Sequence, residues 1–254
     1  MNGLTGIVFH WSAGGGKASA IDRQHYHYMV QQDGTIVPGD HPPEDNINTR
    51  DGDYAAHTLN ANTGRIGVAL CGMMGAVERP FNAGSAPINW PQINALCGLL
   101  ADLCRRYNIP VTRQTVLSHA EVQPTLGIAQ RGKWDVAWLP GMAAAGDPVQ
   151  IGDRIRAHAA LHHLRQHLGR IAQQCDRLGL TLCGVVRNAR QRIVEVAGLF
   201  VDVARFQTEI DTALLAFTIQ RAGARSGRGQ RLRAAPAART RCYYPAPLQS
   251  ARVV

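Results

Sequence analysis

Two short apolar runs that each lead into a histidine most constrain the fold of this 254-residue chain. Residues 6–9 form one run and lead into His10, before a polar, glycine-rich segment. Residues 115–117 form the other, with His119 just beyond it. Short apolar runs of this kind are typical of buried strands. Neighbouring strands would bring both imidazole rings to one edge of a sheet, so we expect a sheet-based fold with a polar site there.

The segment after His119 carries a third candidate metal ligand. We expect a loop that reaches Asp135, with Lys133 two residues earlier. Neutral imidazole and carboxylate are good ligands for a divalent metal such as zinc. A lone histidine at a strand end is more often an ordinary surface residue, so the predicted site rests on both histidines together with the Lys133-x-Asp135 pair. Glu121 is the nearest alternative carboxylate.

The rest of the first 149 residues predicts strands mixed with helices. The Asp33-Gly34 turn favours a hairpin, and Pro91 is compatible with the first turn of a helix. The expected elements are hairpin strands at 26–31 and 35–37, a loop at 38–53, a buried strand at 65–72 and an amphipathic helix from about residue 89 to 107. This pattern predicts an α/β fold, in which helices flank a central mixed β-sheet.

Charge divides the chain into parts. Residues 1–149 hold ten Lys and Arg against twelve Asp and Glu, whereas residues 150–254 hold seventeen against six, so the net charges are −2 and +11. Such asymmetry usually indicates separate roles. We expect a catalytic domain at 1–148, a helical region at 149–220, built as a hairpin or coiled coil, and a disordered arginine-rich tail at 221–254.

The C-terminal third suggests two kinds of partner. Apolar residues from 157 to 178 alternate steps of four and three, which is a heptad seam that could support self-association or pack in a helical hairpin. The four histidines of this helix are expected to be solvated rather than metal-bound. The tail from Arg221 holds eight arginines and no acidic residue, which favours an anionic partner such as an envelope surface, nucleic acid or lipid, although it could also lack a function.

Composition adds three expectations. No apolar run is long enough to cross a bilayer. The N-terminal segment lacks the basic start and apolar core of a signal peptide, so we expect the chain to be made in the cytoplasm without one. Six scattered cysteines, of which Cys97 and Cys104 fall on the apolar side of the predicted helix, favour buried thiols over a disulfide framework.

Five segments occur along the chain in a fixed order: IVFHWSA, HYHYMVQQDGTIV, AAHTLNANTGRIGVALCG, SHAEV and RGKWD. In this order they resemble the zinc-dependent N-acetylmuramoyl-L-alanine amidases, a family that includes phage lysins, bacterial anhydro-muropeptide amidases and animal peptidoglycan recognition proteins. They span roughly the first 140 residues. Each motif alone is weak, but their shared order makes the resemblance specific.

The resemblance implies a mostly parallel mixed sheet with one zinc ion at its edge. Carried onto this chain, the zinc ligands are His10, His119 and Asp135, and the fourth position stays open for water. Zinc-activated water would attack the lactyl carbonyl of N-acetylmuramic acid at its amide link to L-alanine. Lys133 would stabilise the negative charge that grows on the carbonyl oxygen.

The remaining family positions point to the phage branch. Some members use a glutamate on the strand that here reads IGVALCG, where this chain has Ala69. The phage branch uses a tyrosine instead, which corresponds to Tyr26, although an ordinary cross-strand aromatic is the simpler alternative. His57 matches a histidine that lines the substrate cleft, or it could be a loop histidine held by hydrogen bonds. His119 and Asp135 are sixteen positions apart, which is longer than the commoner family spacing of about ten.

Three functions remain open at this point. The first is a phage or prophage endolysin that reaches the cell wall by a holin-type route. The second is a cytoplasmic amidase that recycles muropeptides. The third is a module that binds peptidoglycan without cutting it. The complete ligand set favours catalysis, and the combination of Tyr26 with Ala69 favours the endolysin.

Overall fold

The computed structural model describes residues 3–177. The tail expected at 221–254 and most of the helical region expected at 149–220 lie outside these residues. The strands are β1 (Gly6–Trp11), β2 (Tyr28–Val30), β3 (Ile36–Pro38), β4 (Arg65–Leu70) and β5 (Val116–Ser118). The helices are α1 (Ala20–His25), the 3-10 helix η1 (Pro43–Ile47), α2 (Trp90–Tyr107), α3 (His119–Leu126) and α4 (Pro148–Arg177).

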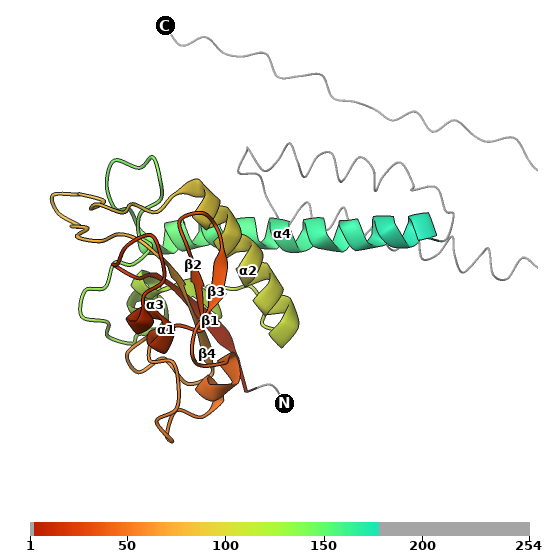
Figure 1. The fold of residues 1–254 in the computed structure, drawn as a ribbon, viewed down its shortest axis with the longest axis horizontal. Helices are drawn as coiled ribbons and strands as arrows, with labels where there is room; N and C mark the ends of the chain where they lie inside the picture. The colour runs from red at the N-terminus through yellow and green to blue at the C-terminus, as the bar shows by residue number, and fades with distance from the viewer. Residues whose placement is uncertain (1–2, 178–254) are drawn as a thin grey trace, which may run out of the picture. The chain divides into compact units, whose positions relative to one another are not determined.

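The five strands form one mixed sheet in the order β3-β2-β4-β1-β5. All neighbours are parallel except the β2–β3 hairpin. The expected α/β fold, with a central mixed sheet and flanking helices, is confirmed (Figure 1). In parallel strands the carboxyl ends share one edge of the sheet, where ligands of open α/β sheets bind. β1 and β5 therefore bring His10 and His119 to the same edge.

Strand alternation divides the core into two sides. Ile7 and Phe9 of β1 belong to the main apolar cluster, together with α2 and the first turns of α4. Val8 belongs to a second cluster with Leu117 and with Val122 of α3. Because side chains alternate along a strand, His10 projects on the same side as Val8, toward α3.

Helix α2 follows its sequence pattern closely. Asn89 is the N-cap, and its side chain accepts a hydrogen bond from the backbone N–H of Gln92. Pro91 lies in the first turn, where its missing N–H costs no helical hydrogen bond. Asn108 ends the helix in the left-handed conformation. The buried side contains Cys97 and Cys104, so the predicted burial of both thiols is confirmed.

Two short helices differ from the sequence expectations. α3 begins at His119, where we expected a loop, because the Glu121 carboxylate caps its first turn and Pro124 is tolerated in so short a helix. α1 ends at His25, so Tyr26 is its C-cap rather than part of the hairpin strand. The hairpin itself is confirmed, with Met29 opposite Val37.

The first turns of α4 pack against the sheet domain. Ile151, Ile155 and Ala159 are buried in the main apolar cluster, and α4 lies beside α2 (Figure 1). Of the predicted heptad seam, Ala157 is half-buried and Leu161 is buried. Self-association through this seam stays a prediction. In the described part of the chain, no helix is both long and apolar enough to span a membrane.

Candidate metal centre

Three buried side chains from separate segments converge at the carboxyl edge of the sheet. His10 Nδ1 lies 3.0 Å from His119 Nδ1. Asp135 Oδ2 lies 3.0 Å from His119 Nδ1 and 3.4 Å from His10 Nδ1. Donor atoms around a tetrahedral zinc ion lie about 3.3 Å apart, because Zn–N and Zn–O bonds are about 2.0–2.2 Å. The spacing of this interior cluster (His10, His119 and Asp135) therefore suits one zinc ion.

Hydrogen bonds fix the tautomer of His10. His57 Nε2 lies 3.2 Å from the Arg65 carbonyl oxygen, so this nitrogen carries the proton and His57 Nδ1 is the acceptor. His10 Nε2 lies 3.3 Å from that acceptor and 3.4 Å from Thr58 Oγ1. A neutral His10 donates its only N–H in this direction. Its Nδ1 lone pair is therefore free to face the interior cluster.

A second set of contacts fixes the tautomer of His119. The Gln130 amide nitrogen donates to the carbonyl oxygens of Leu59 and Ile128, at 2.9 and 3.4 Å, which determines the orientation of the amide. Gln130 Oε1 then accepts from His119 Nε2 at 2.8 Å. The Nδ1 of His119 consequently also faces inward as a lone pair. Two imidazole lone pairs and one carboxylate thus meet at a point that suits a cation.

The electrostatics agree with this assignment. Burial lowers the pKa of His10 to about 4, although Asp135 opposes the shift. Burial alone would raise the pKa of Asp135, but the adjacent His10 and His119 rings outweigh it and hold that pKa well below its usual range. At neutral pH the cluster therefore holds an ionised carboxylate beside a neutral His10, and metal ligands must be deprotonated in this way.

The backbone around Asp135 is unusual. Val136, directly after Asp135, has φ 63°, a left-handed conformation that is rare for a β-branched residue. Its side chain is fully buried in the main apolar cluster, which holds the strained conformation in place. Strained residues are often found at functional sites, where surrounding packing maintains them. Here packing fixes the direction in which the Asp135 carboxylate points.

Tyr26 and Lys133 border the interior cluster. The rings of Tyr26 and His10 are 5.1 Å apart between centroids. Burial raises the pKa of Tyr26, and the negative charges of Asp135 and Asp22 raise it further, so its phenol is protonated at neutral pH. Lys133 is exposed, and its positive charge contributes to the lowered pKa of His10. The Lys133 ammonium therefore lies within electrostatic range of His10.

A family comparison now identifies the domain. Residues 2–141 match the model of a family described as N-acetylmuramoyl-L-alanine amidase. The chain belongs to this amidase family. The match includes every residue of the interior cluster, together with Tyr26 and Lys133.

Solved structures of two clostridial amidases match part of this chain. The amidase LysC from Clostridium intestinale URNW is 16% identical, with a TM-score of 0.35, over 62% of this chain and 87% of that chain. The endolysin amidase LysCS from the same organism is 15% identical, with a TM-score of 0.34, over 61% of this chain and 86% of that chain. A comparison with curated protein sequences gave no match.

Two sequence positions of the amidase can now be placed. Glu121, the alternative ligand, points away from the interior cluster: its Oε2 accepts the Ser118 backbone N–H at 2.8 Å, and its Oε1 lies 2.7 Å from Arg156 Nη2. Ala69 is fully buried and pairs with His10 across the β1–β4 ladder. The position at which the resemblance implied a glutamate in some members therefore lies beside His10, but it offers no acid here.

His57 lies behind the interior cluster of the amidase rather than in open solvent. It is only 7% exposed and contacts His10 through the hydrogen bond described above. β4 leaves room for its ring at Gly67, where a Cβ would lie 2.5 Å from the ring. Substrate contact by His57, which the resemblance implied, stays a prediction, whereas the observed contacts orient His10.

Sequence reasoning did not identify Thr58, Gln130 and Asn46. Thr58 Oγ1 is 2.7 Å from His57 Nδ1. Asn46 accepts from His27 Nε2 at 3.0 Å, and His27 in turn accepts the Gly67 backbone N–H at 2.8 Å. Thr58 directly follows His57 in its motif, and this position could have marked it as a residue of the site. Gln130 lies in the long segment between His119 and Asp135, and nothing in its sequence surroundings marks it.

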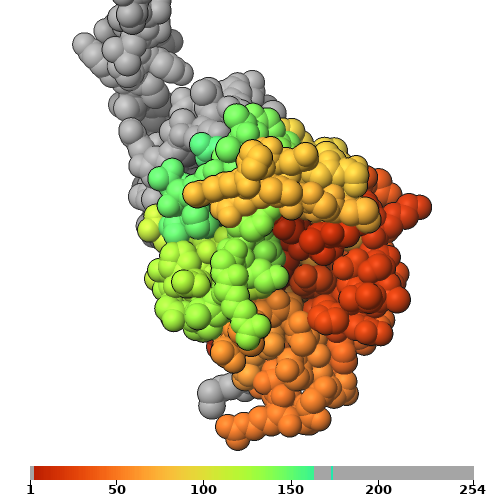
Figure 2. All heavy atoms as spheres, turned by 90° about the vertical axis from the view of Figure 1, so that its left-hand side faces the viewer, coloured from red at the N-terminus to blue at the C-terminus, as the bar shows by residue number. Residues whose placement is uncertain are grey.

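Loops frame the site at the surface of the amidase. Figure 2 shows a hollow where the red segments around β1 lie deep between the green segments around residues 119–145 and the amber segment around 73–88. The longer spacing between His119 and Asp135 is accounted for by α3 and the loop that carries Gln130. The extra residues therefore add contacts around the interior cluster and leave His10, His119 and Asp135 close together.

A second group of donors lies on the loop around η1. His41 Nδ1 is 3.3 Å from Asp45 Oδ2 and 3.2 Å from Asp53 Oδ1. We refer to His41, Asp45 and Asp53 as the loop cluster. The side chain of Asp53 is 80% exposed. A partly exposed histidine between two carboxylates forms such contacts without a metal.

Proposed function

We propose that this amidase is a zinc enzyme that hydrolyses the amide bond between N-acetylmuramic acid and L-alanine in peptidoglycan. The observation that carries the proposal is the convergence of two imidazole lone pairs and the Asp135 carboxylate, with each tautomer fixed by hydrogen bonds. Three protein ligands are the usual number at a catalytic zinc site, whereas structural sites have four.

The residues of the interior cluster would hold the ion. A zinc ion bound there supplies a Lewis acid and lowers the pKa of water from 15.7 to about 7. His57 and Gln130 keep the two ligand histidines in the required tautomer. Such outer contacts typically change metal affinity by about 10- to 100-fold when removed.

Lys133 and Tyr26 would act on the substrate. Amide hydrolysis develops negative charge on the carbonyl oxygen, and the exposed Lys133 ammonium can stabilise it there. The protonated phenol of Tyr26 is suited to donate a hydrogen bond or a proton, because its raised pKa opposes ionisation. We therefore assign Tyr26 to the donor side of the reaction, beside the leaving amine of L-alanine.

Among the roles found in the family, we favour that of an endolysin. It is supported by Tyr26 beside His10 and by Ala69 at the position where some relatives carry glutamate. The charge of +11 in residues 150–254 also suits attraction to the anionic bacterial envelope. We propose that an endolysin of this kind reaches the wall by a holin-type route.

Metal analysis combined with product analysis tests the proposal. Purified protein should contain one zinc ion per chain by mass spectrometry. A chelator should abolish the clearing of a peptidoglycan suspension, and added zinc should restore it. The products should contain new L-alanine amino termini without new reducing sugars. Full activity in zinc-free protein would refute the zinc mechanism, and reducing ends would indicate a glycosidase.

A further inference from the structure

Helix α4 lies beyond residue 141, where the family match ends, yet it reaches the structure beneath a metal ligand. We propose that Arg156 of α4 is a positioning residue: it holds the first turn of α3 and thereby the ligand His119. This inference rests on the proposed zinc site. It adds the first turns of α4 to the functional unit of the amidase.

Arg156 is a buried cation with several partners. It is only 6% exposed. Its Nη1 donates to the Val116 carbonyl oxygen at 2.8 Å, at the start of β5. Its Nη2 lies 2.7 Å from Glu121 Oε1 and 2.8 Å from Asp153 Oδ1, and it donates to the Val149 carbonyl oxygen at 3.3 Å. One guanidinium therefore joins α4 to both β5 and α3.

Glu121 transmits this contact to the metal site. It is fully buried, and its Oε2 accepts the Ser118 backbone N–H at 2.8 Å. α3 starts at the next residue, His119. The position of the Glu121 carboxylate therefore determines where the His119 backbone lies.

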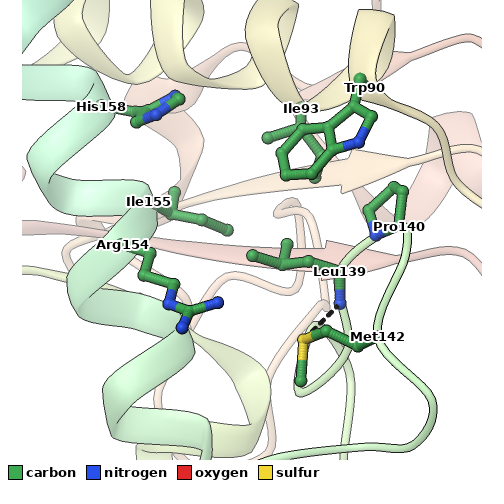
Figure 3. Close-up of a pocket in the computed structure, with 8 residues that line it drawn as sticks. All are labelled: Trp90, Ile93, Leu139, Pro140, Met142, Arg154, Ile155 and His158. Atoms are coloured by element: carbon green, nitrogen blue, oxygen red, sulfur yellow. Dashed lines mark hydrogen bonds between the residues drawn. The ribbon is translucent and has the colours of Figure 1, made fainter. Parts of the chain in front are cut away.

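Close packing holds α4 over this carboxylate. A Cβ added at Gly152 would overlap the Glu121 carboxylate, so glycine is needed for the helix to approach so closely. Figure 3 shows Arg154, Ile155 and His158 of α4 facing Trp90 and Ile93 of α2. The loop residues Leu139 and Met142 complete a cavity of about 60 Å³ between these elements. α4 thus rests on the same loop that follows Asp135.

The energetics of buried charge make Arg156 important. A buried ion pair adds little net stability, but the removal of one partner leaves an uncompensated charge and is strongly destabilising. Without Arg156, the buried Glu121 carboxylate loses its partner and would move toward solvent. This movement alters the cap of α3, and His119 would lose its fixed position relative to His10 and Asp135.

The test compares variants of the full chain in metal-free form. Zinc affinity is measured by competition with a chromogenic chelator, at a temperature where circular dichroism shows every variant to be folded. Arg156→Met should bind zinc about tenfold more weakly and should melt about 10 °C lower. Arg156→Met combined with Glu121→Gln should recover most of both losses, because glutamine can still accept the Ser118 N–H and carries no charge.

Controls separate the possible outcomes. Arg105→Ala removes an exposed arginine that pairs with Asp102 on α2, and it should change neither zinc affinity nor melting temperature.

If Arg156→Met lowers the melting temperature but leaves zinc affinity unchanged, Arg156 is merely structural and the inference is wrong. Failure of the double variant to recover zinc affinity would also overturn it. If Arg156→Met does not fold, Glu121→Ala, which removes the cap and keeps the arginine, must weaken zinc binding. Wild-type protein without zinc affinity would instead refute the proposed function itself.

Discussion

The interior cluster and the loop cluster contain the same kinds of donor atoms at similar spacing, but their surroundings differ. The interior cluster is buried, and separate hydrogen bonds fix the proton positions of both its histidines. The loop cluster lies at the surface, and His41 spans its two carboxylates directly. The comparison teaches that donor spacing alone does not define a metal centre. Desolvation and fixed tautomers suit one cluster to a cation, whereas solvent reaches the side chains of the other and can satisfy them.

The largest expected effect comes from removing the carboxylate of the interior cluster. Removing a carboxylate of the loop cluster serves as the control. Asp135→Ala should lose the bound zinc and all activity, because the interior cluster then has only two ligands. Asp53→Ala is the matched control and should keep one zinc per chain. Metal content and peptidoglycan clearing measure both. Zinc retained in Asp135→Ala but lost in Asp53→Ala would reverse the assignment.

Lys133 should affect catalysis without affecting the metal. Lys133→Met should keep one zinc per chain and lose about 100- to 1000-fold in kcat/KM, because transition-state charge loses its donor. A soluble muropeptide is the substrate for this assay. Loss of zinc from the variant would show instead that Lys133 supports the interior cluster itself.

Tyr26 should have a comparable but smaller effect. Tyr26→Phe preserves the ring beside His10 and removes only the hydroxyl. We expect about a 100-fold loss in kcat, at the low end for proton-transfer groups, with unchanged zinc content. The kinetics of the purified variant decide this point. A variant with wild-type kcat would leave Tyr26 as a packing residue, the simpler alternative.

His57 tests whether tautomer control distinguishes the two clusters. His57→Leu removes the acceptor that faces His10 Nε2, and it should weaken zinc binding about tenfold. His57→Asn can place an oxygen near the lost Nδ1 and should recover part of the affinity. Chelator competition measures both variants. Equal zinc affinity in wild type and His57→Leu would show that the histidine does not orient His10.

The last prediction is the acid stability of the protein, which concerns the buried histidines near the interior cluster. His27 is 1% exposed, and burial lowers its pKa to about 4. Between this value and its unfolded pKa of about 6.5 the unfolded chain binds more protons, so stability falls as pH falls through this window. One such group lowers the free energy of unfolding by at most about 3 kcal/mol between pH 7 and 4.

Denaturant unfolding of the metal-free protein at several pH values measures this effect. His27→Gln cannot take up a proton and should flatten the dependence below pH 6.5. An unchanged slope in that variant would assign the acid sensitivity to other groups, of which buried His10 is the nearest candidate.

Much of the sheet and α2 could be predicted because their signals are local. Apolar runs indicate β1 and β4, and the Asp33-Gly34 turn indicates the hairpin. α3 was missed because its start depends on a single capping carboxylate within a segment of low helical periodicity. Tyr26 was placed in a strand because β-prone residues follow it, whereas the end of α1 determines its position.

For the site, the sequence predicted the three members of the interior cluster but not the groups that contact them. His10, His119 and Asp135 are recognisable by residue type and by motif. Gln130 and Arg156 act through contacts between segments far apart in the sequence. Gln130 contacts Leu59, which lies 71 positions away along the chain, and Arg156 contacts Val116, which lies 40 positions away. Such contacts leave no periodic or spacing signal in a single sequence.

The buried cysteines of the sheet domain have a consequence for the chemical durability of the amidase. Burial raises the pKa values of Cys71, Cys97 and Cys104 to about 12, so each remains a neutral thiol at neutral pH. The thiolate is the form that reacts with peroxides and disulfides and that binds soft metal ions. These three sulfur atoms are therefore shielded from oxidants and do not compete with the interior cluster for zinc. The fold of this domain therefore does not rely on disulfides between these three residues.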